Sequence, residues 1–353
     1  AFCLNPPRSR ERNFRLFALL KLSLVLKAFC LNPSRSFPLI KALSPASSPS
    51  RILCTASAKT QEDMSGVVKS VGKLGFPYKT LDPFLFCVYH KDDYPAGDTK
   101  MQAPRRGNGA DFDWSQPYRM YHGDRIPGFP QHPHRGFETI TVTTQGLCDH
   151  TDSMGNAGRY GEGDLQWMTA GGGIVHGEMF PLIHQDRPNP LRLFQLWINL
   201  PAKSKMVPPT FCMHWHEKIP KISREGAEVV VYAGALEGLS ALPPPPESYA
   251  SQPGSDVAVL TVDLQPGASY TIPPAAGGAS TNRVLYFVEG AGVKIGGQEL
   301  GEHLMVTVDA SKPCDVQGVG PGPSQVLMLQ GKPIGEPVAQ HGPFVMNTQA
   351  EIQ

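Results

Sequence analysis

Two short motifs carry histidine and carboxylate side chains at a spacing suited to metal binding. The first is His132-Pro133-His134, and the second, further along the chain, is His176-Gly177-Glu178. On a β-strand, residues i and i+2 point to the same side of the sheet, so each motif would present both of its polar ends on one face. Two neighbouring strands would then bring three imidazoles and one carboxylate around a single ion.

Three imidazoles and a carboxylate form a mixed nitrogen and oxygen ligand set. Such a set suits Fe(II), Mn(II), Cu(II), Ni(II) or Zn(II) rather than Ca(II) or Mg(II). An octahedral ion held this way keeps positions open for a substrate and for O2 or water, whereas a closed tetrahedral zinc site keeps none. The spacing therefore predicts a metal centre with open coordination positions.

The remaining histidines are weaker candidates for such a centre. His214-Trp215-His216 repeats the spacing of the first motif, but it lies in a proline-rich stretch without a matching carboxylate, and we expect it at the surface. The second half of the chain has only His303 and His341, far apart in sequence, so a comparable site is not expected there. Four further histidines are isolated and are expected to be structural: His90, His122, His150 and His184.

The elements that must position these motifs are short strands. The chain has 353 residues, of which 41% are hydrophobic, with 36 Gly and 35 Pro, a composition that favours many tight turns. We expect strands in β-branched or alternating runs bounded by Gly, Pro, Asn and Asp, at 85–89, 139–143, 193–200, 228–232, 257–264, 269–272, 283–288, 304–308 and 325–329. This pattern predicts an all-β protein of two barrels or sandwiches in tandem.

Charge divides the chain into two unlike parts. Residues 1–60 hold ten Lys or Arg side chains and one Glu, which leaves 22 basic and 30 acidic side chains in the remainder of a chain of net charge +1. An acidic body argues against a general nucleic-acid-binding surface. The apolar run at 16–26 is too short, and with Lys21 too charged, to span a bilayer, so we expect no membrane insertion.

The first sixty residues are typical of a targeting segment. They are rich in Arg, Ser and Leu and nearly free of acids, and residues 44–56 resemble the end of a chloroplast transit peptide. We therefore predict a chloroplast location, with a mitochondrial presequence or a secretory signal as alternatives. Residues 1–10 are nearly repeated at 28–37, and if residues 1–60 do not belong to the protein, a cytosolic or nuclear location follows.

Three longer motifs carry a family resemblance. They are FPQHPHRGFET at 129–139, GDLQWMTAG at 163–171 leading to HGEM at 176–179, and HGPFVMNT at 341–348. Together they resemble the signatures of the pirin family of bicupins, over about residues 65–353. The resemblance implies two tandem cupin barrels: a metal-binding domain at 65–202, a connector at 203–222 and a metal-free domain at 223–353, after a transit peptide or disordered extension at 1–60.

The resemblance also implies one non-haem iron, Fe(II), in the first barrel. Its ligands would be His132, His134, His176 and Glu178. Glu138 offers an alternative, because it follows His134 at the spacing where general cupins place a glutamate ligand, and parity along a strand would put it on the inner face. The pirin resemblance favours Glu178 as the ligand and leaves Glu138 as a pocket group, and both are candidate catalytic bases.

Two functions from different classes follow from the resemblance. Some pirins act as quercetin 2,3-dioxygenases, which implies an enzyme that uses Fe(II), a small phenolic substrate and O2, with Phe137 and Trp167 lining an apolar mouth. Other pirins resemble redox-sensing cofactors of transcription regulators, which implies a protein partner and no turnover. A metal-dependent isomerase, or another cupin activity, is a third interpretation, because fold alone does not determine function.

Overall fold

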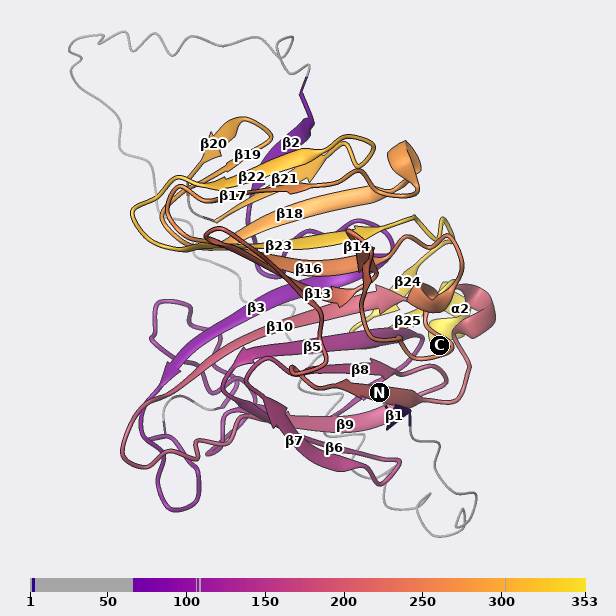
Figure 1. The fold of residues 1–353 in the computed structure, drawn as a ribbon. Helices are drawn as coiled ribbons and strands as arrows, with labels where there is room; N and C mark the ends of the chain where they lie inside the picture. The colour runs from indigo at the N-terminus through magenta and orange to yellow at the C-terminus, as the bar shows by residue number, and fades with distance from the viewer. Residues whose placement is uncertain (1, 4–65, 106, 108, 302) are drawn as a thin grey trace, which may run out of the picture. The chain divides into compact units, whose positions relative to one another are not determined.

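Nearly every element of this computed structural model is a β-strand, as the short β-branched runs predict (Figure 1). The structure describes residues 2–3, 66–105, 107, 109–301 and 303–353. Strand β5 (Phe137–Gln145) shows the local cause, because its threonines alternate with Ile140 and Val142. Seven of its nine residues are buried, so this strand is covered on both faces and its polar threonines lie inside the molecule.

The first barrel is built from two antiparallel sheets. The larger sheet has the order β1 (Phe2–Cys3), β11 (Thr210–His214), β8 (Leu165–Thr169), β5, β10 (Asn189–Asn199) and β3 (Phe84–Tyr94). The smaller sheet has the order β4 (Gly128–His134), β9 (Ile174–Met179), β6 (Leu147–Asp152) and β7 (Ala157–Gly161). The two metal-binding motifs predicted from the sequence both fall on this smaller sheet, on β4 and β9.

The second barrel repeats the plan with a seven-stranded and a four-stranded sheet. The larger has the order β12 (Lys221–Arg224), β13 (Ala227–Ala233), β16 (Ala258–Leu264), β23 (Ser324–Gly331), β18 (Asn282–Glu289), β21 (Leu304–Val308) and β2 (Val68–Lys73). The smaller has the order β17 (Ser269–Ile272), β22 (Cys314–Gly318), β19 (Val293–Ile295) and β20 (Gln298–Leu300). Two hairpins and a short helix complete it: β14 (Ala235–Leu236) with β15 (Leu239–Ser240), β24 (Ala339–His341) with β25 (Phe344–Met346), and α2 (Gln349–Ile352). Three short 3-10 turns lie at Ala202–Ser204, Tyr249–Ser251 and Gly278–Ser280.

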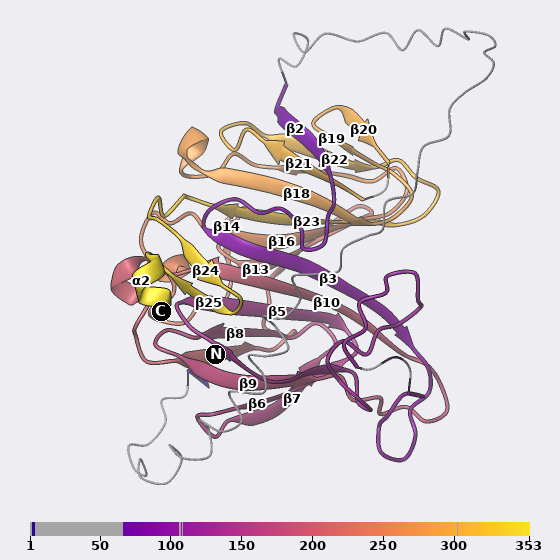
Figure 2. The same cartoon turned by 180° about the vertical axis from the view of Figure 1, so that it is seen from behind.

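Apolar packing joins the two barrels. One core cluster contains Ile140, Trp167 and Leu196 from the first barrel and side chains such as Val259 and Tyr286 from the second. Each large side chain removed from water in this way contributes roughly 1.5–3 kcal/mol. Residues 66–353 accordingly belong to one compact unit, in which the large sheets of the two barrels face each other across this shared core (Figure 2).

Several strands lie outside the runs predicted from the sequence, and two of them pair in places that the predicted domain bounds do not suggest. Strand β2 precedes the first barrel in the chain, yet it pairs with β21 at the edge of the second. Strand β11 lies within residues 203–222, which were expected to form an irregular connector, and it pairs with β8 of the first barrel. Edge strands need little apolar alternation: five of the six residues of β2 are exposed, so its pattern gave no strand signal.

The predicted transit peptide at residues 1–60 lies outside the described residues, except for Phe2–Cys3. The backbone of that pair runs antiparallel to β11. Among the residues that the structure describes, no helix has the length and apolar character needed to cross a membrane.

Candidate metal centre

The register between β4 and β9 brings the two predicted motifs together. His132 lies directly opposite His176 in the antiparallel ladder, and side chains of directly opposed residues share one face of the sheet. His134 and Glu178 are each two residues further along their strands, so both point to that same face. A β-bulge between Phe129 and His132 allows this register.

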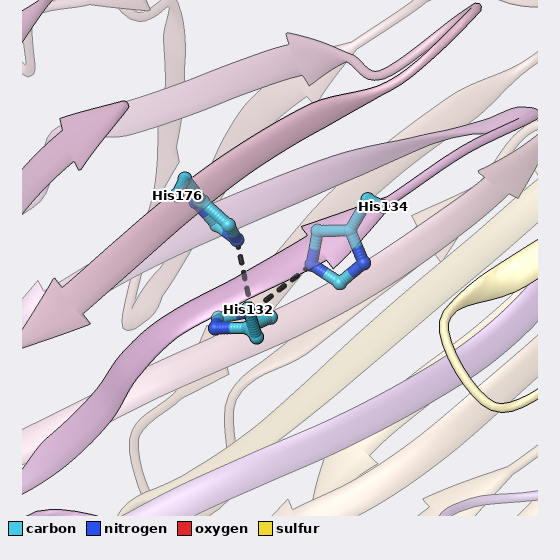
Figure 3. Close-up of side chains that lie close together, drawn as sticks. All are labelled: His132, His134 and His176. Carbon is cyan, nitrogen blue, oxygen red and sulfur yellow. Dashed lines mark hydrogen bonds between the residues drawn. The ribbon is translucent and has the colours of Figure 1, made fainter. Parts of the chain in front are cut away.

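Three of the four predicted ligands converge at their ring nitrogens (Figure 3). His132 Nε2 lies 3.1 Å from His134 Nε2 and 3.0 Å from His176 Nε2. Nitrogens held about 2.1 Å from one ion at right angles lie about 3.0 Å apart, whereas a tetrahedral angle places them about 3.4 Å apart. The two distances from His132 Nε2 fit the spacing of neighbouring ligands of an octahedral ion better than that of a tetrahedral one.

The three imidazoles are held in the neutral form that metal binding requires. Burial lowers the pKa of His134 and His176 well below the ordinary histidine value, and the other histidines of the cluster lower it further. His132 Nδ1 lies 2.9 Å from the Pro130 carbonyl oxygen, which only accepts. Nδ1 therefore carries the proton, and the lone pair of His132 is on Nε2, where the other two rings meet it.

Glu178 lies beside the cluster. Its Oε2 is 3.9 Å from His176 Nε2, and its Oε1 accepts a hydrogen bond from the hydroxyl of Thr141 on β5, at 3.1 Å. The Thr141 hydroxyl also lies 2.9 Å from Gln195 on β10. The ligand atoms of the three histidines all lie within 4.8 Å of one another, and Glu178 falls outside that group. The structure thus places Glu178 next to the three nitrogens, held by a hydroxyl from the facing sheet.

Glu138 does not lie on the inner face, so that expectation is wrong. Its two carboxylate oxygens accept hydrogen bonds from Thr169 Oγ1, at 2.7 Å, and from Ser248 Oγ of the second barrel, at 2.6 Å. Phe137 is the neighbour that reaches His134, with ring centroids 5.1 Å apart. Gly136, at φ +81°, lies in the connection between β4 and β5, which belong to different sheets, so the alternation of side chains along β4 does not continue to Glu138.

An aromatic group borders the cluster on the β3 and β10 side. Trp197 stacks on Phe86 and packs against Phe137, at centroid distances of 4.5 and 4.4 Å, and its ring lies 5.5 Å from that of His134. Phe86 and Trp197 are half-buried, while Phe137 is fully buried. Trp167, which was expected at the same mouth, instead packs in the core shared with the second barrel.

Sequence reasoning missed His150 as a neighbour of the centre. His150 lies opposite Glu178 on β6; its ring is 5.4 Å from that of His176, and its Nε2 is 3.2 Å from Asp152 Oδ2. The signal was present, because His150 and Asp152 have the same i, i+2 spacing as the motif on β9. His214, expected at the surface, is buried, and its Nε2 lies 3.0 Å from the Pro243 carbonyl oxygen.

The fold and the site together define a class of protein. Two tandem antiparallel barrels, the first of which holds the histidine cluster, are the arrangement of a bicupin. The family models Pirin and Pirin C-terminal cupin domain match residues 71–198 and 259–353. The chain belongs to the pirin family.

Individual relatives agree with this assignment. A pirin-like protein of Solanum lycopersicum is 38% identical over 234 residues, which cover 64% of this chain and 72% of the relative. Human pirin is 37% identical over 236 residues, or 66% of this chain and 76% of the relative. Among solved structures, a quercetin 2,3-dioxygenase from Acinetobacter baumannii aligns with a TM-score of 0.61 at 26% identity, covering 81% of this chain and 92% of that one.

Proposed function

We propose that this protein is a non-haem iron dioxygenase that acts on flavonols, such as quercetin, with O2 as co-substrate. The observation that carries the proposal is the convergence of three imidazoles beside Glu178, of which His134 and His176 are buried and His132 is partly exposed, and all three have lowered pKa values. Fe(II) is proposed as the metal because the donor set mixes nitrogen with oxygen and the nitrogen spacing suits an octahedral ion with open positions. The likeness to a structure described as a quercetin 2,3-dioxygenase supports the reaction class.

When bound, Fe(II) supplies Lewis acidity toward a phenolic oxygen and a one-electron couple for reaction with O2. The protein supplies the proton acceptor. Glu178 keeps Oε1 occupied by Thr141, which leaves Oε2 to take the proton of the flavonol 3-hydroxyl. In the overall reaction both atoms of O2 enter the substrate, its central ring opens, and one ring carbon leaves as carbon monoxide.

The aromatic group supplies orientation. Phe86 and Trp197 are half-buried beside His134, and we propose that the exposed parts of these rings contact the planar ring system of the substrate. The indole N–H of Trp197 is buried and has no hydrogen-bond partner among the described residues, so it is available to an oxygen of the substrate. No catalytic step is assigned to Glu138, since its carboxylate is bonded to Thr169 and Ser248.

The test measures O2 uptake and carbon monoxide release by the full chain, loaded anaerobically with Fe(II) and then given quercetin. Carbon monoxide from the parent, and none from His176→Ala or Glu178→Ala, is the expected result. Trp197→Phe keeps the stacking surface without the N–H, so we expect it to raise KM less than Trp197→Ala does. Bound iron without turnover on any phenolic substrate contradicts the proposed enzymatic function. It favours the redox-sensing alternative, in which a protein partner binds according to the oxidation state of the iron.

We also propose that residues 1–60 direct the protein to the chloroplast, on the strength of their basic, acid-poor composition. A fluorescent protein fused behind these residues is expected in plastids. Fluorescence in mitochondria would support the alternative presequence, and fluorescence confined to the cytosol would contradict both.

A further inference from the structure

A buried lysine lies behind the histidine cluster. Lys205 is 1% exposed, and its ammonium group donates to Asn199 Oδ1 at 2.7 Å, to the Gly136 carbonyl at 2.9 Å and to the Val345 carbonyl at 3.5 Å. These three acceptors match the three donors of an ammonium group. No carboxylate of the described residues forms an ion pair with Lys205, so these three oxygens replace the water that burial removes.

The backbone held by this lysine follows directly after a predicted ligand. Arg135 and Gly136 connect His134, at the end of β4, to β5. The Arg135 N–H donates to the Pro343 carbonyl at 3.2 Å, and the Arg135 carbonyl accepts from the Val345 N–H at 3.0 Å. The Gly136 N–H donates to the Gly171 carbonyl at 2.8 Å, and its carbonyl accepts from Lys205. Every backbone polar group of the two residues is therefore bonded.

The C-terminal hairpin is one of the partners, although it follows the second barrel in sequence. Arg135 and Phe344 form a parallel bridge, and in both views β24 and β25 lie near the ends of β5 and β10 (Figure 1 and Figure 2). A Cβ at Gly136 would lie 1.8 Å from the Val345 carbonyl oxygen, so the approach leaves no room for a side chain. Beyond the hairpin, Asn347 Nδ2 and the Ala202 N–H both donate to Glu336 Oε2, which ties the tail to the turn that precedes Lys205.

The same segment supports the second ligand-bearing strand. Two residues after Lys205, the Val207 carbonyl accepts from the Gly172 N–H at 2.8 Å. Gly172 belongs to the turn that leads into β9 and His176. Arg135 Nε donates to the Gly172 carbonyl at 2.7 Å and so links the two turns to each other. Residues 205–207 thus hold the turn after His134 and the turn before His176 at once.

We propose that Lys205 is a positioning residue of the metal centre, which fastens the turn behind His134 to the C-terminal hairpin so that the tail of the second barrel completes the site in the first. This inference rests on the proposed metal binding. The three nitrogens tolerate little displacement, because groups that orient a ligand typically change metal affinity by about 10–100-fold when they are lost. Lys205 touches neither substrate nor metal and acts through the backbone of the ligand loop.

The test uses Co(II) as the probe and the full chain throughout. Lys205→Met keeps the length and apolar volume of the side chain and removes its donors, and Lys203→Met is the matched control, since Lys203 is exposed two residues away. We expect Lys205→Met to weaken Co(II) binding, measured by chelator competition, by about 10–100-fold and to change the visible absorption of the bound Co(II). Lys203→Met is expected to leave both unchanged.

A second pair of variants separates positioning from stability. In Lys205→Met with Asn199→Leu, the acceptor at residue 199 is removed together with its donor, and only the carbonyls of Gly136 and Val345 still lack the ammonium group, so part of the lost stability is regained. Stability is expected to return toward the parent value while Co(II) affinity and absorption stay altered. Asn199→Asp, which retains an acceptor for Lys205, is expected to bind Co(II) like the parent.

The outcomes distinguish the two proposals. A parent chain that does not bind Co(II) contradicts the proposed metal centre itself. A parent that binds, with Lys205→Met matching Lys203→Met in affinity and spectrum, overturns the role of Lys205 alone. The role is equally overturned if the double variant regains affinity together with stability. If Lys205→Met fails to fold, the Co(II) affinity and spectrum of the double variant test the role of Lys205 instead.

Discussion

The two barrels share an antiparallel two-sheet plan and differ in what they enclose. Inside the first barrel, one sheet presents His132, His134, His176 and Glu178, and the facing sheet supplies the Thr141 hydroxyl that bonds Glu178. The second barrel encloses a cluster made almost entirely of aliphatic and aromatic side chains, among them Leu260, Leu285 and Val306. The same fold can therefore enclose either a polar site or an apolar core, and a few side chains determine which.

The comparison also shows what the barrel without the histidine cluster contributes to the other. It covers the outer face of the large sheet of the first barrel with apolar residues, it supplies Ser248 to the buried Glu138, and its tail binds the turn behind His134. A metal centre inside one barrel thus has supports that lie in the other. The predictions below test that division of roles, beginning with the largest effect.

Removing a ligand from the first barrel is expected to have the largest effect. His176→Ala removes one of the three converging nitrogens, so the metal loses a ligand. We expect metal affinity to fall by more than about 100-fold, which exceeds the loss typical of residues that only orient a ligand. The control is His303→Ala, since His303 is an exposed histidine of the second barrel. Metal content after dialysis, measured by elemental analysis, checks both, and equal metal in the two variants would place the site elsewhere.

Truncating the interior of the second barrel is expected to cost stability without touching the metal. Leu285 is fully buried in its apolar cluster, and Leu→Ala at such a position costs about 2–5 kcal/mol through lost burial and the cavity left behind. Urea unfolding measures the loss, and chelator competition on the folded variant is expected to give the affinity of the parent. A large loss of affinity at temperatures where Leu285→Ala remains folded would show that the two interiors are coupled more directly.

The difference between the barrels explains why part of the molecule was predictable. The strands and the tandem all-β class follow from local patterns, and the three-histidine cluster follows because two i, i+2 motifs lie on neighbouring strands in register. The family resemblance had already implied both the barrels and the ligand set. These features depend on neighbours in sequence or on one pairing of adjacent strands.

The features that sequence reasoning missed depend on contacts across the molecule. Glu138 was assigned to the wrong face because its parity was counted through Gly136, where the chain passes from one sheet to another. Strand β2 carries too little apolar alternation to reveal its pairing with β21. Lys205 resembles any surface lysine in the sequence, and only its three distant acceptors show that it is buried.

The contact between the barrels at Glu138 is expected to depend on pH. Burial raises the pKa of Glu138 from 4.5 to about 7, although the hydroxyls of Ser248 and Thr169 act to lower it. The folded protein therefore retains a proton that the unfolded chain releases between these two values, so this group makes stability fall as the pH rises from 4.5 to 7, by up to about 3 kcal/mol in all.

Glu138→Gln removes that titration and keeps a neutral group able to bond both hydroxyls. As the pH rises, we expect the free energy of unfolding of the variant to fall less than that of the parent. Urea unfolding of the metal-free proteins at intervals between about pH 5 and pH 8 measures the difference, in which the other titrating groups cancel. Parallel pH curves for parent and variant would mean that Glu138 is already charged in the folded protein.

The smallest expected effect separates two threonines of one strand. Thr141 and Thr143 are both buried on β5, but the Thr141 hydroxyl bonds Glu178 Oε1, whereas the Thr143 hydroxyl has no partner among the described residues. Thr141→Val is expected to weaken metal binding by about tenfold, because Glu178 loses the group that orients it. Thr143→Val removes an unsatisfied buried hydroxyl and is expected to keep metal affinity and to preserve or raise stability. Chelator competition and urea unfolding of the two variants measure these effects. Equal metal affinities would mean that the Thr141 hydroxyl is not needed to hold Glu178 and that the facing sheet only encloses the site.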